Sequence, residues 1–275
     1  MPQHLLCKGR LISLETPVVM GILNLSPDSF YGGSRVSGYA SLLDRAEQML
    51  AEGALLLDLG AQSTRPGSER ISEDEELRRL TGAIEAILKR FPDALLSIDS
   101  YLPSVARYAI EAGAAMINDI SGGGTDNEMI YLAGSLGVPY ICMHLHGNPE
   151  TMHKRPDYNS VTREVIDFFI SKTEVCRVAG VNDLILDPGF GFSKNIGDNF
   201  RMLHELEQFK LLGKPLLAGI SRKSTIYKTL GVSADEALNG TTVLNTVALM
   251  KGAKILRVHD VKEAVEAVKL VTKIA

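Results

Sequence analysis

The sequence predicts an α/β protein, a single-domain closed (β/α)8 barrel over residues 1–275, and three observations lead to this prediction. Short apolar segments recur along the chain, each too short to form a helix. Amphipathic segments with helical spacing lie between them, which is typical of a parallel sheet. The repeat is even, at about 33 residues per strand–helix unit, and no Pro/Ser-rich linker divides the chain.

Eight buried strands are expected, because each apolar segment is hydrophobic on both of its faces. In chain order the segments are 18–24, 54–60, 94–99, 114–119, 139–144, 183–188, 215–220 and 254–259. The residues before the first strand, 5–15, alternate around Lys8-Gly9. This alternation predicts an N-terminal β-hairpin that closes the floor of the barrel.

Helices are expected between the strands. The amphipathic segment 39–52 stops at Gly53, a typical C-cap residue. Ser72 followed by Glu75 has the pattern of a capping box, and Pro103 suits the first turn of a helix. Further helices are expected at 160–179, 198–211, 234–250 and 261–274. The alternative fold, an open doubly wound sheet, usually carries a GxGxxG motif after its first strand, and this chain has none there.

The composition excludes several classes of protein. Hydrophobic residues make up 45% of the chain and charged residues 23%, which is typical of a globular protein and not of a disordered one. No apolar run reaches the ~18 residues that span a bilayer, and the first residues lack a signal-peptide core, so we expect a cytoplasmic protein without a membrane partner. The net charge of −4 gives no reason to expect nucleic acid as a partner. Cys7, Cys142 and Cys176 lie far apart and are expected to be reduced.

Polar side chains end nearly every predicted strand. In (β/α)8 barrels, chemistry takes place at the carboxyl ends of the strands. One such residue is more often a helix cap or turn former than part of a site, whereas a complete set favours a polar ligand across the barrel mouth. The set consists of Asn24, Asp58, Asp99, Asn118, His144, Asp187, Ser221-Arg222-Lys223 and Arg257 with His259.

The chemistry of this set indicates the ligand. Asp99, Asn118 and Asp187 offer carboxylates and an amide, which complement a flat heterocycle rich in N–H donors and ring nitrogens. Lys223 and the pair at 257 and 259 add positive charge near the last two strands, where barrels commonly bind phosphate. The residues therefore predict a ligand with a heterocycle at one end and an anion at the other.

Three loops are rich in special residues. Residues 26–35 contain proline, hydroxyls and paired glycines, which favours a mobile lid, and residues 62–70 place hydroxyls beside Arg65, which suits phosphate oxygens. A solvated surface loop is an equally good interpretation of each of these two. In the third loop, 187–195, glycines place Phe190 and Phe192 near the rim, where a substrate wall competes with ordinary packing.

Three further motifs carry less weight. His144-x-His146 resembles a zinc pair, but the further ligands of metal-dependent hydrolase barrels are missing, so structural or rim roles are favoured. The glycine-rich segment 120–126 is more typical of a flexible connection than of a phosphate cradle. Asp260 is placed to cap the last helix.

At these strand ends the sequence resembles the dihydropteroate synthases, pterin-binding barrels of folate biosynthesis that sulfonamide drugs target. The resemblance runs from the first strand to the last. It rests on GILNLSPDSF (21–30), DLGAQSTRPGS (58–68), SIDS (97–100), INDISGG (117–123), MHLHGNPETM (143–152), LDPGFGFSKN (186–195), GISRKS (219–224) and RVHD (257–260), all in family order.

The resemblance implies a transferase, usually a homodimer, that joins 6-hydroxymethyl-7,8-dihydropterin pyrophosphate to p-aminobenzoate with Mg²⁺ as cofactor. The products would be 7,8-dihydropteroate and pyrophosphate. By position, the resemblance assigns pterin binding to Asp99, Asn118, Asp187 and Lys223; pyrophosphate binding to Asn24, Thr64, Arg65, Arg257 and His259; Mg²⁺ binding to Asn24; and p-aminobenzoate binding to Phe30, Pro66, Phe192 and Ser224. Asp99, Asp187, Lys223 and Arg65 are the implied catalytic residues, in an SN1-like substitution whose cation the carboxylates stabilise.

The chain departs from the family pattern at two places. Tyr31 follows Phe30 where the family usually carries a second loop acid, and Gln62 stands where many members have Glu. Two alternatives remain at this point: a corrinoid-linked, pterin-dependent methyltransferase barrel and a non-catalytic pterin-binding relative. The first would not need the anion-binding residues, and the second would be expected to lose residues such as Asn24 or Lys223.

Overall fold

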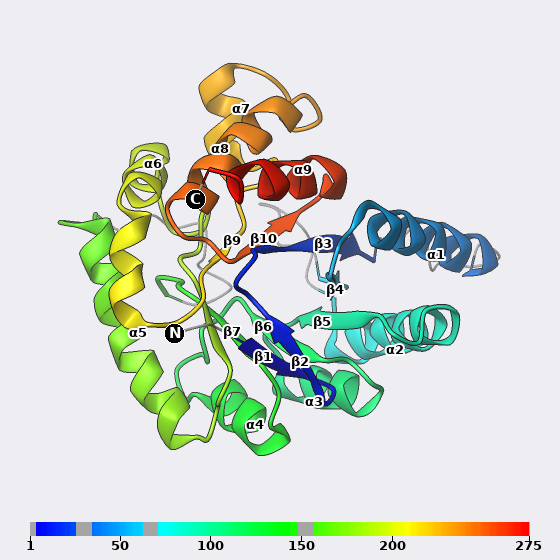
Figure 1. Cartoon of the computed structure of the whole chain (residues 1–275). Coiled ribbons are helices and arrows are strands. Elements are labelled where there is room, and N and C mark those ends of the chain that lie inside the picture. The colour runs from blue at the N-terminus through cyan, green and yellow to red at the C-terminus, as the bar shows by residue number, and fades with distance from the viewer. Residues whose placement is uncertain (1–3, 26–34, 63–70, 148–156, 275) are drawn as a thin grey trace.

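The computed structural model describes residues 4–25, 35–62, 71–147 and 157–274, with the backbone alone for 35–38. Its main sheet has eight parallel strands inside a ring of helices (Figure 1). The strands are β3 (Val18–Asn24), β4 (Leu56–Gly60), β5 (Leu95–Asp99), β6 (Met116–Asp119), β7 (Tyr140–Met143), β8 (Leu184–Asp187), β9 (Leu217–Ala218) and β10 (Ile255–Val258). Each of them lies within a segment that the apolar pattern predicts.

The sheet closes on itself as a barrel. The strands are ordered β8-β7-β6-β5-β4-β3-β10-β9. A parallel bridge between Leu186 and Leu216 joins the two ends of this order, and the Leu186 amide donates to the Pro215 carbonyl at 2.9 Å. The predicted (β/α)8 barrel is therefore confirmed, and the open doubly wound sheet is excluded.

Helices follow the strands and cover the outside of the barrel. They are α1 (Arg35–Glu52), α2 (Glu73–Arg90), α3 (Pro103–Glu111), α4 (Glu128–Leu136), α5 (Val161–Val178), α6 (Ile196–His204), α7 (Ser224–Leu230), α8 (Leu238–Met250) and α9 (Val261–Val271), with a 3-10 segment η3 (Leu206–Leu212) after α6. Ser72 caps α2 by accepting from the Glu75 amide at 3.3 Å, and Pro103 is the first residue of α3, as predicted. The Glu75 carboxylate itself binds Arg78 and Arg79.

Two helices, α4 and α7, were not expected from the sequence. α4 has little polar contrast between its faces because buried Met129, Ile130, Leu132 and Ala133 follow one another closely, so its amphipathic signal is weak. α7 has only seven residues, too few for a clear helical period. The expected helix over 198–211 is in fact α6 followed by the tighter η3, and the helix expected over 234–250 begins at Leu238.

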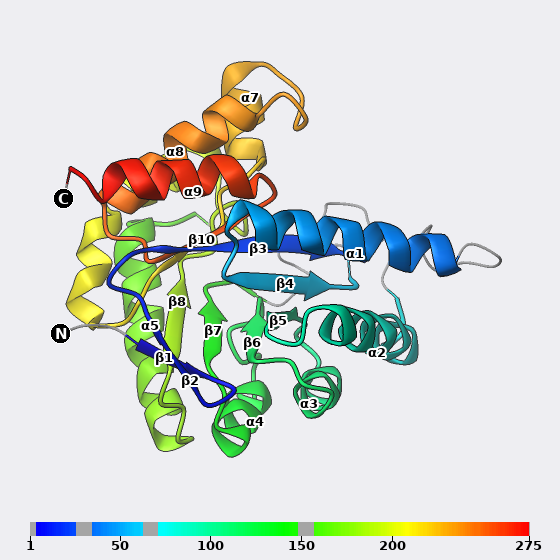
Figure 2. The ribbon, with the colours of Figure 1, turned by 45° about the vertical axis from the view of Figure 1, so that its right-hand side comes forward.

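The N-terminal hairpin is present and closes the barrel floor (Figure 2). Strands β1 (His4–Cys7) and β2 (Arg10–Ser13) pair antiparallel around Lys8 and Gly9, whose φ angles of 50° and 76° are those of a tight hairpin turn. Leu5 and Cys7 pack against the lower apolar residues inside the barrel, which include Met20, Leu56, Leu95 and Ile255.

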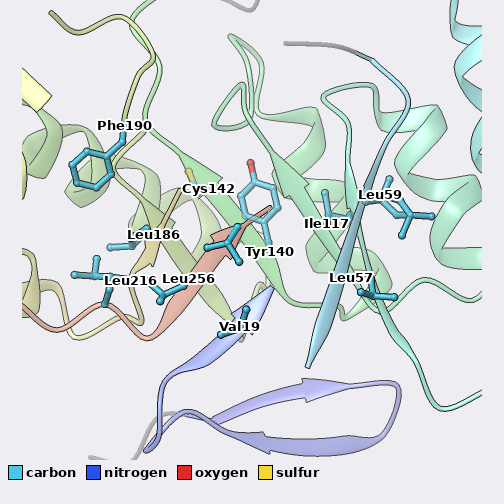
Figure 3. Packing of buried hydrophobic residues seen from close by; sticks show 14 of the residues in the cluster. Val19, Leu57, Leu59, Ile117, Tyr140, Cys142, Leu186, Phe190, Leu216 and Leu256 are labelled. Carbon is cyan, nitrogen blue, oxygen red and sulfur yellow. The ribbon is translucent and has the colours of Figure 1, made fainter. Parts of the chain in front are cut away.

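A second apolar layer lies between the strands and the surrounding helices (Figure 3). Val19, Leu57, Ile117 and Leu256 point outward from their strands into this layer. Since side chains alternate along a strand, the residues between them point into the barrel. Above the apolar floor these inward residues are polar at the strand ends, so the fold gathers the predicted polar set at one mouth.

The parts of the chain that the structure describes contain no helix long and apolar enough to cross a membrane. Cys7, Cys142 and Cys176 are buried free thiols.

Candidate active site

Arg257 lies at the centre of the barrel mouth and binds two buried carboxylates. Its Nε donates to Asp58 Oδ2 and its Nη2 to Asp99 Oδ2, both at 2.6 Å. Asn118 Nδ2 donates to the same Asp58 oxygen at 3.0 Å. The parallel register explains this arrangement in part, because it places Asp99 directly beside Asn118. Four residues of the predicted strand-end set therefore form one hydrogen-bonded network.

The electrostatics of this network follow from burial. Burial raises the pKa of Asp99 to about 7; Arg257 opposes this rise, whereas nearby Asp58 and Glu76 add to it. Arg257 is the cation that compensates two adjacent carboxylates, and one of its guanidinium nitrogens, Nη1, takes no part in either ion pair. The network therefore places one arginine between two buried carboxylates at the mouth of the barrel.

Lys223 and Asp187 form a second charged pair in the mouth. A Cβ atom placed on Gly219 would lie 3.8 Å from Lys223 Nζ and 3.9 Å from Asp187 Oδ2, so both groups border the same point. Lys223 Nζ donates to the Phe190 carbonyl and lies 4.4 Å from the centre of the Phe192 ring.

Burial shifts the proton affinities of this pair as well. Burial lowers the pKa of Lys223 to about 8, and Asp187 opposes the change. Burial raises the pKa of Asp187, and here Lys223 opposes the change. The proton affinities of Lys223 and Asp187 therefore depend on each other.

His259 lies beside the N-terminus of α9 and is held by Ser221. The Ser221 hydroxyl accepts from the His259 amide at 3.2 Å and lies 3.1 Å from His259 Nδ1. The hydroxyl oxygen has two lone pairs, so it accepts from the amide and can hydrogen-bond to Nδ1 in either tautomer of the ring. Arg45 Nη2 donates to the His259 carbonyl at 2.6 Å and adds a further positive charge at this side of the mouth.

Asp260 does not cap α9 through its side chain, contrary to the prediction. Its two carboxylate oxygens accept from Arg222 Nε at 2.9 Å and Nη2 at 2.7 Å. This bidentate ion pair fixes Arg222, whose φ of 54° is left-handed, and so shapes the loop that carries Lys223. The planar match of guanidinium and carboxylate is the stronger interaction and outcompetes the cap.

The structure locates the remaining assigned residues only in part. Asn24 is exposed at the end of β3, and half-buried Ser224 is the first residue of α7. Gln62 Oε1 accepts from the Ile71 amide at 3.0 Å and so joins the two ends of the second loop. Four assigned residues lie outside the described residues, together with most of the two loops at 26–35 and 62–70: Phe30, Thr64, Arg65 and Pro66.

The third loop corrects one sequence interpretation. Phe190 is 2% exposed and belongs to the core between strands and helices, so it is a packing residue and not part of a rim (Figure 3). Phe192 is half-buried and packs against a small cluster at the mouth that contains Ile120, Met143 and Leu145. Gly191 lies between the two residues with a φ of 82°, so the chain turns here and does not hold both rings on one side as an extended strand would.

Two motifs with little weight in the sequence have structural roles. Asp119 accepts from the Ser121 and Gly123 amides, both at 2.7 Å, so these amides hold the glycine-rich segment and do not face a phosphate. His144 is buried, with Nδ1 3.0 Å from Lys194 Nζ. Among the residues that the structure describes, no group of three or more His, Cys, Asp or Glu side chains is arranged to hold a metal ion.

Sequence reasoning missed the roles of Asp58 and Lys194. Asp58 stood in the strand-end set without an assigned ligand, and its pairing with Arg257 spans 199 positions of the chain. Lys194 follows a glycine-rich loop and has no local pattern that marks it as buried. The only sequence signal for Asp58 was its place at a strand end.

A family model described as "Pterin binding enzyme" matches residues 20–259, from the first barrel strand to the last polar strand end. This barrel, with its buried carboxylates and basic residues at one mouth, belongs to the pterin-binding enzyme family. A curated relative, the dihydropteroate synthase of Escherichia coli strain K12, is 41% identical over 269 residues, which are 97% of this chain and 95% of the relative. The dihydropteroate synthase of Haemophilus influenzae is 39% identical over 268 residues, 97% of each chain. Within the family, the chain belongs to the dihydropteroate synthases.

Solved structures agree with this placement. The chain matches the dihydropteroate synthase of Xanthomonas albilineans with 4-aminobenzoic acid at a TM-score of 0.90 and 35% identity, covering 100% of this chain and 98% of that one. It matches the Yersinia pestis dihydropteroate synthase in a sulfonamide drug complex at a TM-score of 0.90 and 40% identity, covering 99% and 98%. The similarity extends over the whole barrel and not over one part of it.

Proposed function

We propose that this chain condenses 6-hydroxymethyl-7,8-dihydropterin pyrophosphate with p-aminobenzoate to give 7,8-dihydropteroate and pyrophosphate. The observation that carries the proposal is the linked network of Asp58, Asp99, Asn118 and Arg257 beside the Lys223–Asp187 pair. It combines buried carboxylates for a pterin with cations for an anionic leaving group. Family membership supports the reaction, and the geometry supports the role proposed for each group.

The pterin would lie against the carboxylate side of the mouth. Asp99 and Asn118 lie at the ends of the neighbouring strands β5 and β6, and Asp187 ends β8; together they offer acceptors and a donor to the edge of a flat ring. Lys223 would contact the same ring, because its ammonium borders Asp187. These buried groups match a ring that exchanges both kinds of hydrogen bond.

The pyrophosphate would lie at the basic side of the mouth. Arg257 and His259 end β10, and the N-terminus of α9 follows directly. Asn24 at the end of β3 and the loop residues Thr64 and Arg65 would complete this site.

Mg²⁺ fits this mouth as a metal held mainly by the substrate. Asn24 is the assigned protein ligand, and an exposed amide oxygen suits a hard cation that keeps waters and substrate phosphate oxygens as its other ligands. The bound ion would supply neutralisation of the charge that develops on pyrophosphate. Without substrate, one amide oxygen is a weak site, and we expect weak binding of Mg²⁺ to the protein alone.

The chemistry requires charge stabilisation more than proton transfer. The bond between the pterin methylene carbon and the pyrophosphate oxygen breaks, and the pyrophosphate leaves with the electron pair. The methylene cation that remains is delocalised over the dihydropterin ring, and the carboxylates of Asp99 and Asp187 stabilise it. The amine nitrogen of p-aminobenzoate then forms the new C–N bond and loses a proton to pyrophosphate or water.

The p-aminobenzoate would bind between Phe192 and Ser224, with Phe30 and Pro66 as the remaining walls. Phe192 lies beside Lys223, so an arylamine stacked on this ring would face the pterin site. Closure over the site by the first two loops would exclude water, which otherwise converts the cation into the free alcohol.

We also propose that the enzyme acts as a homodimer in the cytoplasm. Leu270 and Ile274, at and beyond the end of α9, are 68% and 75% exposed, and Val243 and Met250 on adjacent α8 are 52% and 62% exposed. Apolar side chains exposed on two neighbouring helices are typical of a subunit interface. The free thiols suit a reducing compartment.

The decisive experiment incubates purified protein with the pterin pyrophosphate, Mg²⁺ and p-aminobenzoate and measures dihydropteroate by chromatography. We expect product that depends on all three additions and equals the pyrophosphate released. A folded protein that forms no dihydropteroate would overturn the proposal. The matched control is Asp99→Asn, which keeps the shape of the side chain and removes the carboxylate.

A further inference from the structure

A second lysine, Lys194, lies buried beneath the loop that carries Phe192. Its side chain is 4% exposed, and its Nζ has three neighbours: His144 Nδ1 at 3.0 Å, the Gly189 carbonyl at 3.1 Å and the Phe192 carbonyl at 3.1 Å. An ammonium group has three N–H donors, so these three acceptors satisfy it completely. His144 then accepts through Nδ1 and carries its proton on Nε2.

Lys223 binds the same loop from the other side. Lys223 donates a hydrogen bond to the Phe190 carbonyl, whereas Lys194 donates to the carbonyls of Gly189 and Phe192. The ring of Phe192 lies 4.4 Å from the Lys223 ammonium. Two lysine ammonium groups therefore bind three carbonyls of one short turn. Of these two lysines, Lys223 lies at the mouth and Lys194 lies below the turn.

The turn packs closely against both of its neighbours. A Cβ on Gly189 would lie 2.2 Å from the His144 carbonyl oxygen, and a Cβ on Gly191 would lie 2.8 Å from Lys223 Cδ. Both glycines have positive φ, at 73° and 82°. The path of the chain past His144 and Lys223 therefore depends on glycine at both positions.

We propose that Lys194 is a positioning residue. Through its hydrogen bonds to His144 and to the 189–192 turn, it keeps the Phe192 ring against the Lys223 ammonium, in the position that binds p-aminobenzoate. The role of the ring rests on the proposed function, whereas the role of Lys194 in the turn rests on its contacts alone. Lys194 touches no substrate in this assignment.

The cost of burying Lys194 supports a specific role. Burial lowers its pKa to about 7, and Asp187 opposes the change. Burial also keeps the pKa of His144 well below its usual value, so His144 is neutral and can accept. An apolar side chain would fill the same space without this cost, but it could not bind two backbone carbonyls and a ring nitrogen.

The first test measures the surroundings of the side chain at position 192 by fluorescence, without any substrate. The chain has no tryptophan, so Phe192→Trp introduces a single tryptophan, whose emission lies to the red of that of the eight tyrosines, at the ring in question. We expect Lys194→Met in this background to shift the emission to the red and to raise acrylamide quenching about threefold. Lys251→Met is the matched control, because that lysine pairs with the exposed carboxylate of Glu207 at the surface, and we expect no change.

A second pair of variants keeps the test valid where Lys194→Met does not fold. His144→Asn retains an acceptor near the position of Nδ1, whereas His144→Leu removes it. We expect the leucine variant to reproduce the red shift and the asparagine variant to resemble the parent. Equal emission from the asparagine and leucine variants would show that Lys194 does not depend on the acceptor of His144. An unchanged spectrum in folded Lys194→Met would overturn the proposal.

The second test uses steady-state kinetics to distinguish a role of Lys194 in positioning Phe192 from a general loss of structure. In the chain with Phe192 intact, we expect Lys194→Met to raise the KM for p-aminobenzoate about tenfold while kcat falls less than threefold. A displaced reporter with an unchanged KM, or an equal loss in kcat with no change in KM, would overturn the link to the substrate. Failure of the wild type to form product would refute the proposed function alone, because the fluorescence test needs no turnover.

Discussion

Replacement of Lys223 by methionine should stabilise the free protein while it weakens pterin binding. Methionine matches the length of the lysine stem and removes the charge. Burial lowers the pKa of Lys223 from 10.5 to about 8, and each pKa unit is worth ~1.4 kcal/mol, so the buried ammonium costs ~3 kcal/mol of folding free energy at neutral pH. Part of this gain is lost again, because Asp187 then lacks its neighbouring cation; since burial already raises the pKa of this carboxyl, it can take up a proton and so avoid an unpaired buried charge. We expect the variant to be ~1–3 kcal/mol more stable at pH 7.

The stability difference between the wild type and Lys223→Met should depend on pH. A lysine with a depressed pKa in the folded state imposes its full cost below that pKa, and the cost disappears as the pH rises toward the unfolded value. Between pH 7 and pH 9 the wild type should therefore gain ~1 kcal/mol relative to Lys223→Met.

The assay is urea unfolding at pH 7 and pH 9 followed by far-UV circular dichroism, with pterin binding measured by calorimetry. Loss of a charged hydrogen bond to the ligand predicts binding that is weaker by roughly 10–100-fold. A variant that is less stable than the wild type at pH 7, or a stability difference that does not change with pH, would refute the reasoning about burial. Unchanged pterin affinity would refute the assignment of Lys223 to the pterin.

Three further predictions address the rest of the site. Arg257→Ala leaves two buried carboxylates without their cation, so it should cost ~3–5 kcal/mol in urea unfolding and weaken pyrophosphate binding more than p-aminobenzoate binding; a loss below ~1 kcal/mol would contradict this. The pH profile of kcat/KM should rise through about pH 7 as Asp99 ionises and fall above about pH 8 as Lys223 loses its proton, and Asp99→Asn should lose the acid limb. Tyr140→Phe removes a hydroxyl that donates to buried Asp119 at 2.7 Å, so unfolding should need ~1–3 kcal/mol less, and an unchanged urea midpoint would contradict a stabilising bond.

The sequence predicted the barrel because its signals are local. An apolar segment such as 18–24 becomes a strand wherever it is buried on both faces, and the structure places β3 at Val18–Asn24. The hairpin was predictable for the same reason, since Lys8-Gly9 is a turn in its own right. α7 was missed because a short helix has no period to detect and is held in place by its neighbours.

The sequence predicted which residues gather at the site, but not which of them bind one another. Asn24, Asp99, Asn118 and Asp187 all stand at strand ends, and this position follows from the strand pattern alone. No local pattern indicates that Arg257 binds both Asp58 and Asp99, because those residues come from other strand–helix units. Only closure of the barrel brings β10 beside β3 and turns three distant side chains into one network.

Burial could not be predicted from the sequence for Phe190 or Lys194 either. Phe190 is buried whereas Phe192 is half-buried, and Lys194 is buried whereas most lysines that the structure describes are exposed. The sequence by itself determined the fold class, the mouth at which the polar groups gather and the family to which they point. The tertiary structure decided which charges meet, that Phe190 belongs to the core, and that Lys194 supports the turn from below. The reason is physical: strand and turn formation depend on neighbours along the chain, whereas pairing and proton affinity depend on distances and desolvation that distant segments create together.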